Sequence, residues 1–498
     1  MNAYVYAPKD DPKHRAEWRD PYDDAQMAEF RALVEHAHGL GIRFGFAISP
    51  GLDIDYASDT DRAALLEKLG PFVDAGVNWF LLALDDIPAA PDLAPRQADV
   101  AGWLFDALRK ERDDTAMVLC PTEYIGTHPS PYLTDLGRLL PTEIDVMWTG
   151  PTVCSPTITS AAAAGWCAAL GGRRPLVWDN YPVNDGAMEP SLHLGPYRGR
   201  DPGLADTTVG ILCNPMRHPQ ASKIALATAA DFMQDPDAYD PVSSWRRAID
   251  AVGGDRRGPL RALAEACSDG PLSEPTELDL ARRVAEVSEE IDGPGWIESM
   301  RNMAEMLRAT KRVRDDFAGD DALAVEIAPW AAAAATEADL GLAALRLLQQ
   351  TRPVAVIDAN VGRAAAVDPD AAMQAAFMIL YVWTAARRSE RVVFGPRFAF
   401  YPNIVQLAGG KPALDVRGAV REDCNGIDAL CRLALGEYDA WQAHATTTVR
   451  VFVDGAQRPV DNAGCFDARG DMVLVRDDRN CTRIGAGDLL PFRDNRLS

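Results

Sequence analysis

The sequence lacks several features that would each point to a particular kind of protein. Its 498 residues contain no apolar run of about 18 or more, so no membrane span is predicted. The nine cysteines include no CxxC pair, and the seven histidines form no HExxH or similar ligand set. No GxGxxG or GxxxxGKS/T loop follows an apolar run. We therefore expect no structural metal and no cofactor.

Positive charge is also scarce. The chain has 50 lysines and arginines against 73 aspartates and glutamates, which gives a formal net charge of -23. Such an acidic protein repels phosphate groups, so we expect neither nucleic acid nor an anionic membrane as a partner. A neutral ligand such as a sugar is indifferent to this charge.

One stretch organises the rest of the chain. The apolar run Trp79–Leu84 is typical of a buried strand, and it ends in two adjacent carboxylates, Asp85 and Asp86. The carboxyl ends of parallel strands are where α/β enzymes place their chemistry. Two neighbouring acids in a partly dry site do not both ionise freely, so we expect one pKa to be raised. The alternative is a helix N-cap followed by a surface acid.

Short apolar runs alternate with amphipathic segments along the first half of the chain. Successive runs start about 30–40 residues apart, which is the length of a βα unit. The segment Ala25–His38, for example, places Met27, Phe30, Leu33 and Val34 on one helical face. The predicted strands are Asn2–Ala7, Arg43–Ile48, Trp79–Leu84, Ala116–Cys120, Asp145–Trp148, Pro175–Trp178 and Thr208–Cys213.

These runs predict a (β/α)8 barrel of the TIM type with its site at the carboxyl ends of the strands, where polar, Gly or Pro residues follow each run. Such a barrel needs eight units, and the sequence shows seven. Because Met1 lies directly before the first run, we expect that the first βα unit is missing and that the chain is truncated or mis-started.

The alternation of apolar runs and amphipathic segments ends after Asn214. We predict three regions: the N-terminally truncated catalytic barrel over 1–235, a helical bundle over 241–352, and a mixed α/β C-terminal region of unknown role over 353–498. The predicted bundle helices are Ser243–Val252, Pro259–Cys267, Thr276–Ile291, Trp296–Phe317, Ala322–Ala335 and Asp339–Gln350.

Eight motifs occur in order and together resemble a known family. They are YVYAPKDDPKHR (Tyr4–Arg15), ISPGLDI (Ile48–Ile54), LDDI (Leu84–Ile87), CPTEY (Cys120–Tyr124), WTGP (Trp148–Pro151), WDN (Trp178–Asn180), GPYRGR (Gly195–Arg200) and CNP (Cys213–Pro215). The chain resembles, over about Asn2 to Asp235, the catalytic barrel of glycoside hydrolase family eighty-four. This family contains O-GlcNAcase and the bacterial β-N-acetylglucosaminidases once described as hyaluronidases. A first strand with a Gly-Phe-Tyr-Gly-like motif, which the family carries, is absent here.

The resemblance implies a mechanism for the two acids. Most retaining glycosidases use two separated carboxylates, a geometry that adjacent residues fit poorly. Adjacent acids suit substrate-assisted catalysis, in which the substrate's own 2-acetamido oxygen attacks the anomeric carbon and forms an oxazoline. By resemblance, Asp85 holds and polarises the acetamido N–H, and Asp86 is the general acid and then the general base.

The resemblance also implies a set of sugar-binding residues. Tyr124 and Asn180 match positions around the acetamido group, and Trp178 matches an aromatic wall of that pocket. Lys9, Asp185 and Asn214 match positions that bind ring hydroxyls. From the residues alone, Trp178 is equally a core tryptophan at a strand end, and Asp185 is a loop-capping aspartate.

The function predicted from the sequence is a retaining exo-β-N-acetylglucosaminidase that hydrolyses terminal β-linked GlcNAc. The partner would be a GlcNAc-bearing glycoconjugate or glycoprotein, including O-GlcNAc on protein. The alternative is a catalytically impaired GlcNAc-binding protein with an incomplete barrel. As given, the chain carries no signal peptide, so we expect a cytoplasmic protein, or a secreted one if the true N-terminus lies upstream.

Overall fold

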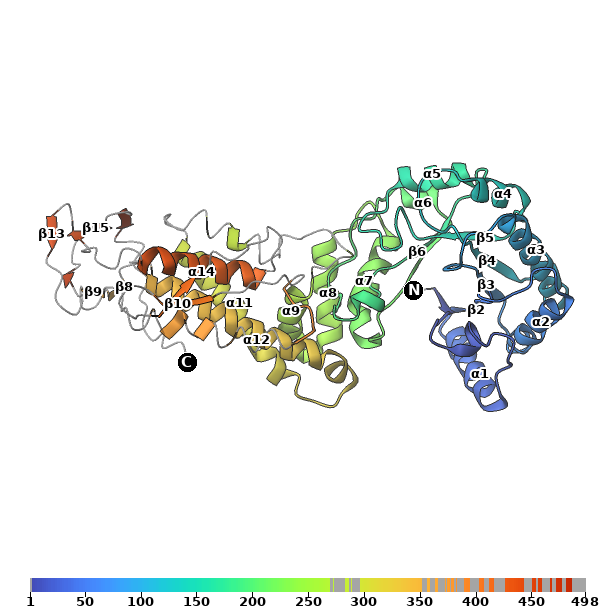
Figure 1. Cartoon of the computed structure of the whole chain (residues 1–498). Coiled ribbons are helices and arrows are strands. Elements are labelled where there is room, and N and C mark those ends of the chain that lie inside the picture. The colour runs from blue at the N-terminus through green and yellow to red at the C-terminus, as the bar shows by residue number, and fades with distance from the viewer. Residues whose placement is uncertain are drawn as a thin grey trace.

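The computed structural model describes residues 2–268 and 296–351 without a break, together with short segments of the remainder. Its first half is a curled sheet of seven parallel strands whose spatial order is their order in the sequence (Figure 1). The strands are β1 (Ala3–Tyr6), β2 (Arg43–Ile48), β3 (Trp79–Ala83), β4 (Ala116–Cys120), β5 (Asp145–Trp148), β6 (Leu176–Asp179) and β7 (Gly210–Cys213).

The sheet is an incomplete (β/α) barrel, as the sequence predicted. Within the described residues β1 and β7 are its two edge strands and do not pair with each other. Most residues of these two strands are only half-buried, whereas β2 to β5 are buried after their first residue. Both faces of the inner strands are covered, which explains why their sequences are continuous apolar runs.

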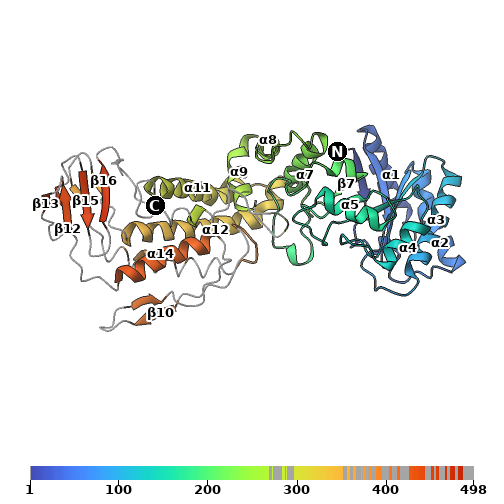
Figure 2. The same cartoon turned by 90° about the horizontal axis from the view of Figure 1, so that it is seen from above.

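Helices alternate with the strands and cover the outer face of the sheet (Figures 1 and 2). Local capping sets their starts: the Ser58, Ser130 and Thr159 side chains each accept a backbone N–H from the first turn, and Asp23 forms a capping box with Gln26. The helices are α1 (Asp24–Gly39), α2 (Asp59–Asp74), α3 (Leu93–Glu111), α4 (Pro131–Leu139), α5 (Ser160–Ala169), α6 (Leu204–Thr207) and α7 (Pro219–Gln234).

The sequence was wrong about one side chain of α1. Met27, Phe30 and Val34 are buried as expected, but Leu33 is 50% exposed. The buried residues form a narrow stripe one turn apart, completed by Ala37, and Leu33 lies at its margin. The stripe packs on an aromatic cluster in which the rings of Phe46 and Phe72 stack with centroids 3.7 Å apart.

A helical region follows the barrel. It contains α8 (Pro241–Gly253), α9 (Arg257–Ala266), α11 (Trp296–Asp316), α12 (Ala322–Thr351) and α14 (Gly426–Gln442). The two helices predicted over Ala322–Ala335 and Asp339–Gln350 are one continuous helix, α12. The intervening residues, Thr336 to Ala338, include no helix breaker, and α12 packs along both α11 and α14.

The helical region holds one loop of the barrel, the segment 180–203 between β6 and α6. The Trp330 indole donates a hydrogen bond to the carbonyl of Pro190 at 2.8 Å, and the Trp245 indole donates one to the carbonyl of Leu194 at 2.6 Å. The Glu326 carboxylate accepts the backbone N–H groups of Gln220 and Ala221 at the start of α7, at 2.8 and 3.0 Å. The two regions are therefore joined by directional contacts.

The described remainder of the chain consists mainly of short strands. They are β8 (Val356–Asp358), β9 (Arg363–Ala365), β10 (Asn403–Gln406), β11 (Pro412–Asp415), β12 (Arg450–Val453), β13 (Ala456–Arg458), β14 (Phe466–Asp467), β15 (Met472–Arg476) and β16 (Cys481–Gly485). The predicted helix Thr276–Ile291 lies mostly outside the described residues. No helix in the described part of the chain is both long and apolar enough to span a bilayer.

Candidate active site

The two adjacent acids lie at the end of β3 in different surroundings. The Leu84 N–H donates to the Cys120 carbonyl at 2.9 Å and so extends the pairing of β3 with β4 as far as the acids. The Asp85 side chain is only 4% exposed, whereas that of Asp86 is 45% exposed. Asp86 has a φ of 54°, so the chain turns sharply there and directs the second carboxylate away from the strand. One acid is therefore buried and its neighbour is accessible.

Lys9 and Tyr124 bring the ends of two other strands to these acids. The Lys9 ammonium, which follows β1, donates to Asp85 and to Asp86. The Tyr124 hydroxyl, which follows β4, donates to Asp86 Oδ1 at 2.7 Å. We call Lys9, Asp85, Asp86 and Tyr124 the ionic group.

The electrostatics of the ionic group decide the pKa of Asp86. Burial favours a raised pKa at Asp86, but the hydrogen bonds from Lys9 and Tyr124 outweigh it and lower the pKa below its usual value. Asp86 is therefore not the acid of the pair with the raised pKa that adjacency predicts, because the Lys9 ammonium bridges the two carboxylates. Burial lowers the pKa of Lys9, but the Asp85 and Asp86 carboxylates outweigh it and raise that pKa.

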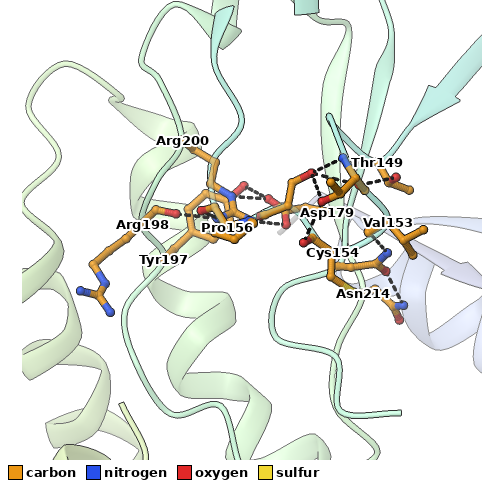
Figure 3. A network of polar contacts seen from close by, with 12 residues as sticks. Thr149, Val153, Cys154, Pro156, Asp179, Tyr197, Arg198, Arg200 and Asn214 are labelled. Carbon is orange, nitrogen blue, oxygen red and sulfur yellow. Dashed lines mark hydrogen bonds and ion pairs between the residues drawn. The ribbon is translucent and has the colours of Figure 1, made fainter. Parts of the chain in front are cut away.

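Two asparagines form a second group at the ends of β6 and β7. Asn180 Nδ2 donates to the Val153 carbonyl at 2.6 Å, and Asn180 Oδ1 accepts Asn214 Nδ2 at 3.0 Å (Figure 3). Because a carbonyl can only accept, the Val153 contact fixes which end of the Asn180 amide carries the nitrogen. That in turn requires Asn214 to present its nitrogen to Asn180. We call Asn180 and Asn214 the amide pair.

Trp178 lies beside the ionic group. It belongs to β6, is partly buried on the inner face of the sheet, and has its ring centroid 5.9 Å from the Lys9 ammonium. A second contact reaches the segment after β1 from the other edge strand: Arg217, beyond β7, pairs with Asp10, beyond β1, at 3.4 Å. The unpaired edge strands are therefore linked at their carboxyl ends, and residues from β1 and β6 meet across the mouth of the sheet.

Asp185 is the predicted site residue that the structure leaves apart from both groups. It is exposed, and it precedes the short 3-10 helix Gly186–Met188 without making a side-chain capping hydrogen bond. The loop-capping alternative therefore does not hold for its side chain. Burial and then the charge of Asp185 raise the pKa of the Cys154 thiol.

Three other residues of the motifs have structural surroundings. Cys120 is fully buried, and burial raises the pKa of its thiol, which suits packing rather than nucleophilic attack. Asp53 pairs with Arg19 at 2.6 Å. The Asp11 carboxylate accepts the hydroxyls of Tyr6 and Tyr22 at 2.9 and 2.7 Å.

Sequence reasoning missed a buried ion pair beside the amide pair. Arg200 and Asp179 have side chains 2% and 1% exposed, and they are joined by two hydrogen bonds. Burial lowers the pKa of Arg200, but Asp179 outweighs it and raises that pKa. The signal was present in the sequence, since both residues lie within the WDN and GPYRGR motifs.

The site therefore combines a buried carboxylate, an accessible carboxylate, a tyrosine hydroxyl and fixed amides at the carboxyl ends of parallel strands. Paired carboxylates with different surroundings divide an acid–base task between them. Within the described residues no group of three or more His, Cys, Asp or Glu side chains is placed to hold a metal ion. Carboxylates at the carboxyl ends of barrel strands are an arrangement with which glycoside hydrolases can carry out their chemistry.

Comparison with known proteins identifies the family. Residues 1–265 match the family model described as beta-N-acetylglucosaminidase, more than half of the chain, and this protein belongs to that family. Over 247 residues it is 35% identical to the protein O-GlcNAcases of Rattus norvegicus and Mus musculus. The match covers 47% of this chain but 26% of each relative, so the chain spans about a quarter of their length.

Solved structures resemble more of the chain. A mutant of the O-GlcNAc hydrolase of Thermobaculum terrenum superposes with a TM-score of 0.72 and 29% identity over 90% of both chains. CpGH84B superposes with a TM-score of 0.69 and 25% identity over 79% of this chain and 69% of its own. The likeness to these structures therefore extends beyond the barrel into the helical region.

Proposed function

We propose that this protein is a retaining exo-β-N-acetylglucosaminidase that removes terminal β-linked GlcNAc by substrate-assisted catalysis. The observation that carries the proposal is the pairing of a buried Asp85 with an accessible Asp86 at one strand end. A single ammonium, that of Lys9, touches both carboxylates. They are therefore too close to act from opposite faces of a sugar ring, as a carboxylate nucleophile and its acid partner do.

The burial of each acid matches a role. The buried Asp85 carboxylate accepts the acetamido N–H and orients the acetamido oxygen toward the anomeric carbon, which forms the oxazoline. The accessible Asp86 protonates the leaving oxygen and later activates water. Lys9 turns to a ring hydroxyl when the sugar binds, which frees Asp86 to take up the proton that it must donate.

The other residues complete the pocket. Tyr124 and the amide pair supply hydrogen bonds to the acetamido group and ring hydroxyls, and Trp178 forms the apolar wall between them. Such contacts raise the rate only where they are stronger in the transition state than in the ground state. A protein carrying O-GlcNAc is the proposed natural substrate, supported by the protein O-GlcNAcases and the O-GlcNAc hydrolase to which the chain is similar.

The proposal is tested by release of 4-nitrophenol from 4-nitrophenyl β-N-acetylglucosaminide. Asp85→Asn should lower kcat by about 10²–10³-fold, because one preorganised transition-state contact is lost. Asp99→Asn makes the same chemical change on the exposed face of α3, where Asp99 pairs with Arg62, and should leave kcat unchanged.

Two outcomes would contradict the mechanism. Equal activity of Asp85→Asn and Asp99→Asn would show that Asp85 has no role in catalysis. Absence of turnover by the parent protein, while it still binds a GlcNAc-thiazoline mimic of the oxazoline, would leave a binding protein in place of an enzyme.

A further inference from the structure

The buried ion pair between Asp179 and Arg200 lies directly behind the amide pair. Asp179 is the last residue of β6 and precedes Asn180 in the chain. Its carboxylate accepts Arg200 Nε at 2.7 Å, Arg200 Nη2, and the Tyr197 hydroxyl at 2.6 Å. Figure 3 shows these side chains converging beside the loop that carries Val153. The planar guanidinium meets the carboxylate at two points, so the geometry of the pair is closely defined.

The remaining donors of Arg200 bind backbone carbonyls. Nη1 donates to Pro156 at 2.9 Å and to Arg198 at 2.6 Å, and Nη2 donates to Ser155 at 3.2 Å. All five N–H donors of the guanidinium are therefore used. Three of these five N–H donors bind backbone carbonyls. Two of the three carbonyls belong to the turn that follows β5.

This turn, residues 149–156, has little freedom to change shape. Gly150 has a φ of +104°, and a Cβ added there would lie 2.4 Å from the Ser155 hydroxyl oxygen. The same hydroxyl accepts the Thr152 N–H at 3.1 Å. On the other side, a Cβ added at Gly199 would lie 2.3 Å from the Pro156 carbonyl oxygen. Glycines at both places allow the segment that carries Arg200 to pack tightly on the turn.

The turn contacts the amide pair at the carbonyl oxygen of Val153. That oxygen accepts Asn180 Nδ2, and Asn180 Oδ1 in turn accepts Asn214 Nδ2. The backbone N–H of Asn214 also donates to the Asp179 carbonyl at 2.8 Å. A continuous set of contacts therefore runs from Arg200 through the turn to both asparagines.

We propose that Arg200 is a positioning residue, which fixes the orientation of the Asn180 and Asn214 amides by tying Asp179 to the 149–156 turn. This inference rests on the proposed function in one respect, that the amide pair faces the sugar. Arg200 itself is buried, and its hydrogen bonds described above go to Asp179 and to backbone carbonyls, not to the amide pair or the ionic group. Arg200 can therefore affect catalysis only by changing the position of Asn180.

The test compares Arg200→Lys with a matched control, Arg173→Lys. A lysine keeps the charge opposite Asp179 but cannot reach the carboxylate at two points and three carbonyls together. Arg173 also donates to backbone carbonyls, those of Leu140, Pro141 and Ile144, but it lies before β6, at the other end of the strand. Variants are compared at a temperature where circular dichroism shows each to be folded, and Asp179→Asn replaces Arg200→Lys if the latter does not fold.

We expect Arg200→Lys to lower kcat about 10- to 10²-fold with a smaller change in KM, because displaced groups lose transition-state contacts first. The control should keep both constants. In an Asn180→Ala background the same Arg200→Lys change should cost little further, because the two residues act in one chain of contacts. Crystal structures of parent and Arg200→Lys should show the Val153 carbonyl and the Asn180 amide displaced.

Failure of the proposed function is distinguishable from failure of this inference. If the parent releases no 4-nitrophenol, the function fails, and the inference is judged by the affinity for GlcNAc-thiazoline and by the two crystal structures. An unmoved Asn180 amide in Arg200→Lys would overturn the inference. So would an Arg200→Lys effect that is the same with and without Asn180.

Discussion

The two halves of the site are held in opposite ways. In the ionic group, Lys9 and Asp86 are well exposed, and their contacts join flexible charged side chains. Behind the amide pair, Arg200 and Asp179 are almost fully buried, and every donor of the arginine is used. One half has two accessible charges beside the buried Asp85 carboxylate, and the other is a neutral amide pair backed by a buried ion pair.

This difference agrees with the roles that the proposed function gives to the two halves. A general acid must exchange protons with water and change its pKa as the substrate arrives, so it needs partial exposure and partners that can move. A group that only holds a sugar amide or hydroxyl gains from being fixed before binding, because ordering it then costs nothing further. Substitutions in the two halves should therefore produce different kinds of effect.

The largest effect is expected at the accessible acid. Asp86→Asn should lower kcat by about 10²–10⁴-fold on a substrate with a poor leaving group, since protonation of the leaving oxygen is lost. The loss should shrink on 4-nitrophenyl glycoside, whose leaving group needs little protonation. Steady-state kinetics on an alkyl and an aryl β-N-acetylglucosaminide measure both numbers, and equal losses on the two would refute the assignment.

The next effect separates a buried from an exposed ion pair. Arg200→Met leaves the Asp179 carboxylate buried and unpaired, and should lower the free energy of unfolding by about 3–5 kcal/mol. Arg217→Met breaks the pair with Asp10, in which both side chains are 67% exposed, and should cost about 0–1 kcal/mol. Urea unfolding of both variants gives the comparison, and similar losses would show that the buried pair is not the stronger constraint.

A smaller effect is expected at the tyrosine of the ionic group. Tyr124→Phe removes one hydrogen bond to the Asp86 carboxylate, and with it the donor that the proposed function directs at the substrate. A hydrogen bond to a charged group contributes about 1.5–3 kcal/mol, so kcat/KM should fall about 10- to 10²-fold. An unchanged kcat/KM in the same 4-nitrophenol assay would place Tyr124 outside the reaction.

The smallest effect is a shift in pH dependence. Lys9→Met removes a hydrogen bond and a positive charge that both lower the pKa of Asp86. That pKa should rise, so the protonated acid persists to higher pH. The limb of the kcat/KM profile in which activity falls with rising pH should therefore move to higher pH. A shift to lower pH would show that Lys9 does not act on Asp86 in this way.

Much of the barrel could be predicted because its patterns are local. The strands Arg43–Ile48, Ala116–Cys120 and Asp145–Trp148 have the predicted bounds, since apolar runs are set by neighbouring residues alone. The same local reasoning predicted two helices where the structure has the single helix α12. The Ala-rich sequence of α12 does not indicate which of its faces pack against α11 and α14.

The site was less accessible to local reasoning. Asp85 and Asp86 could be singled out because they end an apolar run. The contacts that decide their chemistry are distant in sequence: Lys9 lies 76 residues from Asp85, and Arg200 lies 21 residues from Asp179. A sequence pattern does not say which charge meets which. It therefore did not identify Lys9 as the partner that lowers the pKa of Asp86, and it left the buried pair unnoticed.

The contact of Glu326 with the first turn of α7 bears on how the protein can be divided. That carboxylate caps the positive end of a barrel helix from the helical region, and Trp330, one turn further along α12, holds the loop that carries Asp185. A fragment that stopped at the last barrel helix would lose both supports. We therefore expect the smallest fragment with a formed sugar pocket to extend through α12. Such a fragment is longer than the barrel domain that contains Asp85 and Asp86.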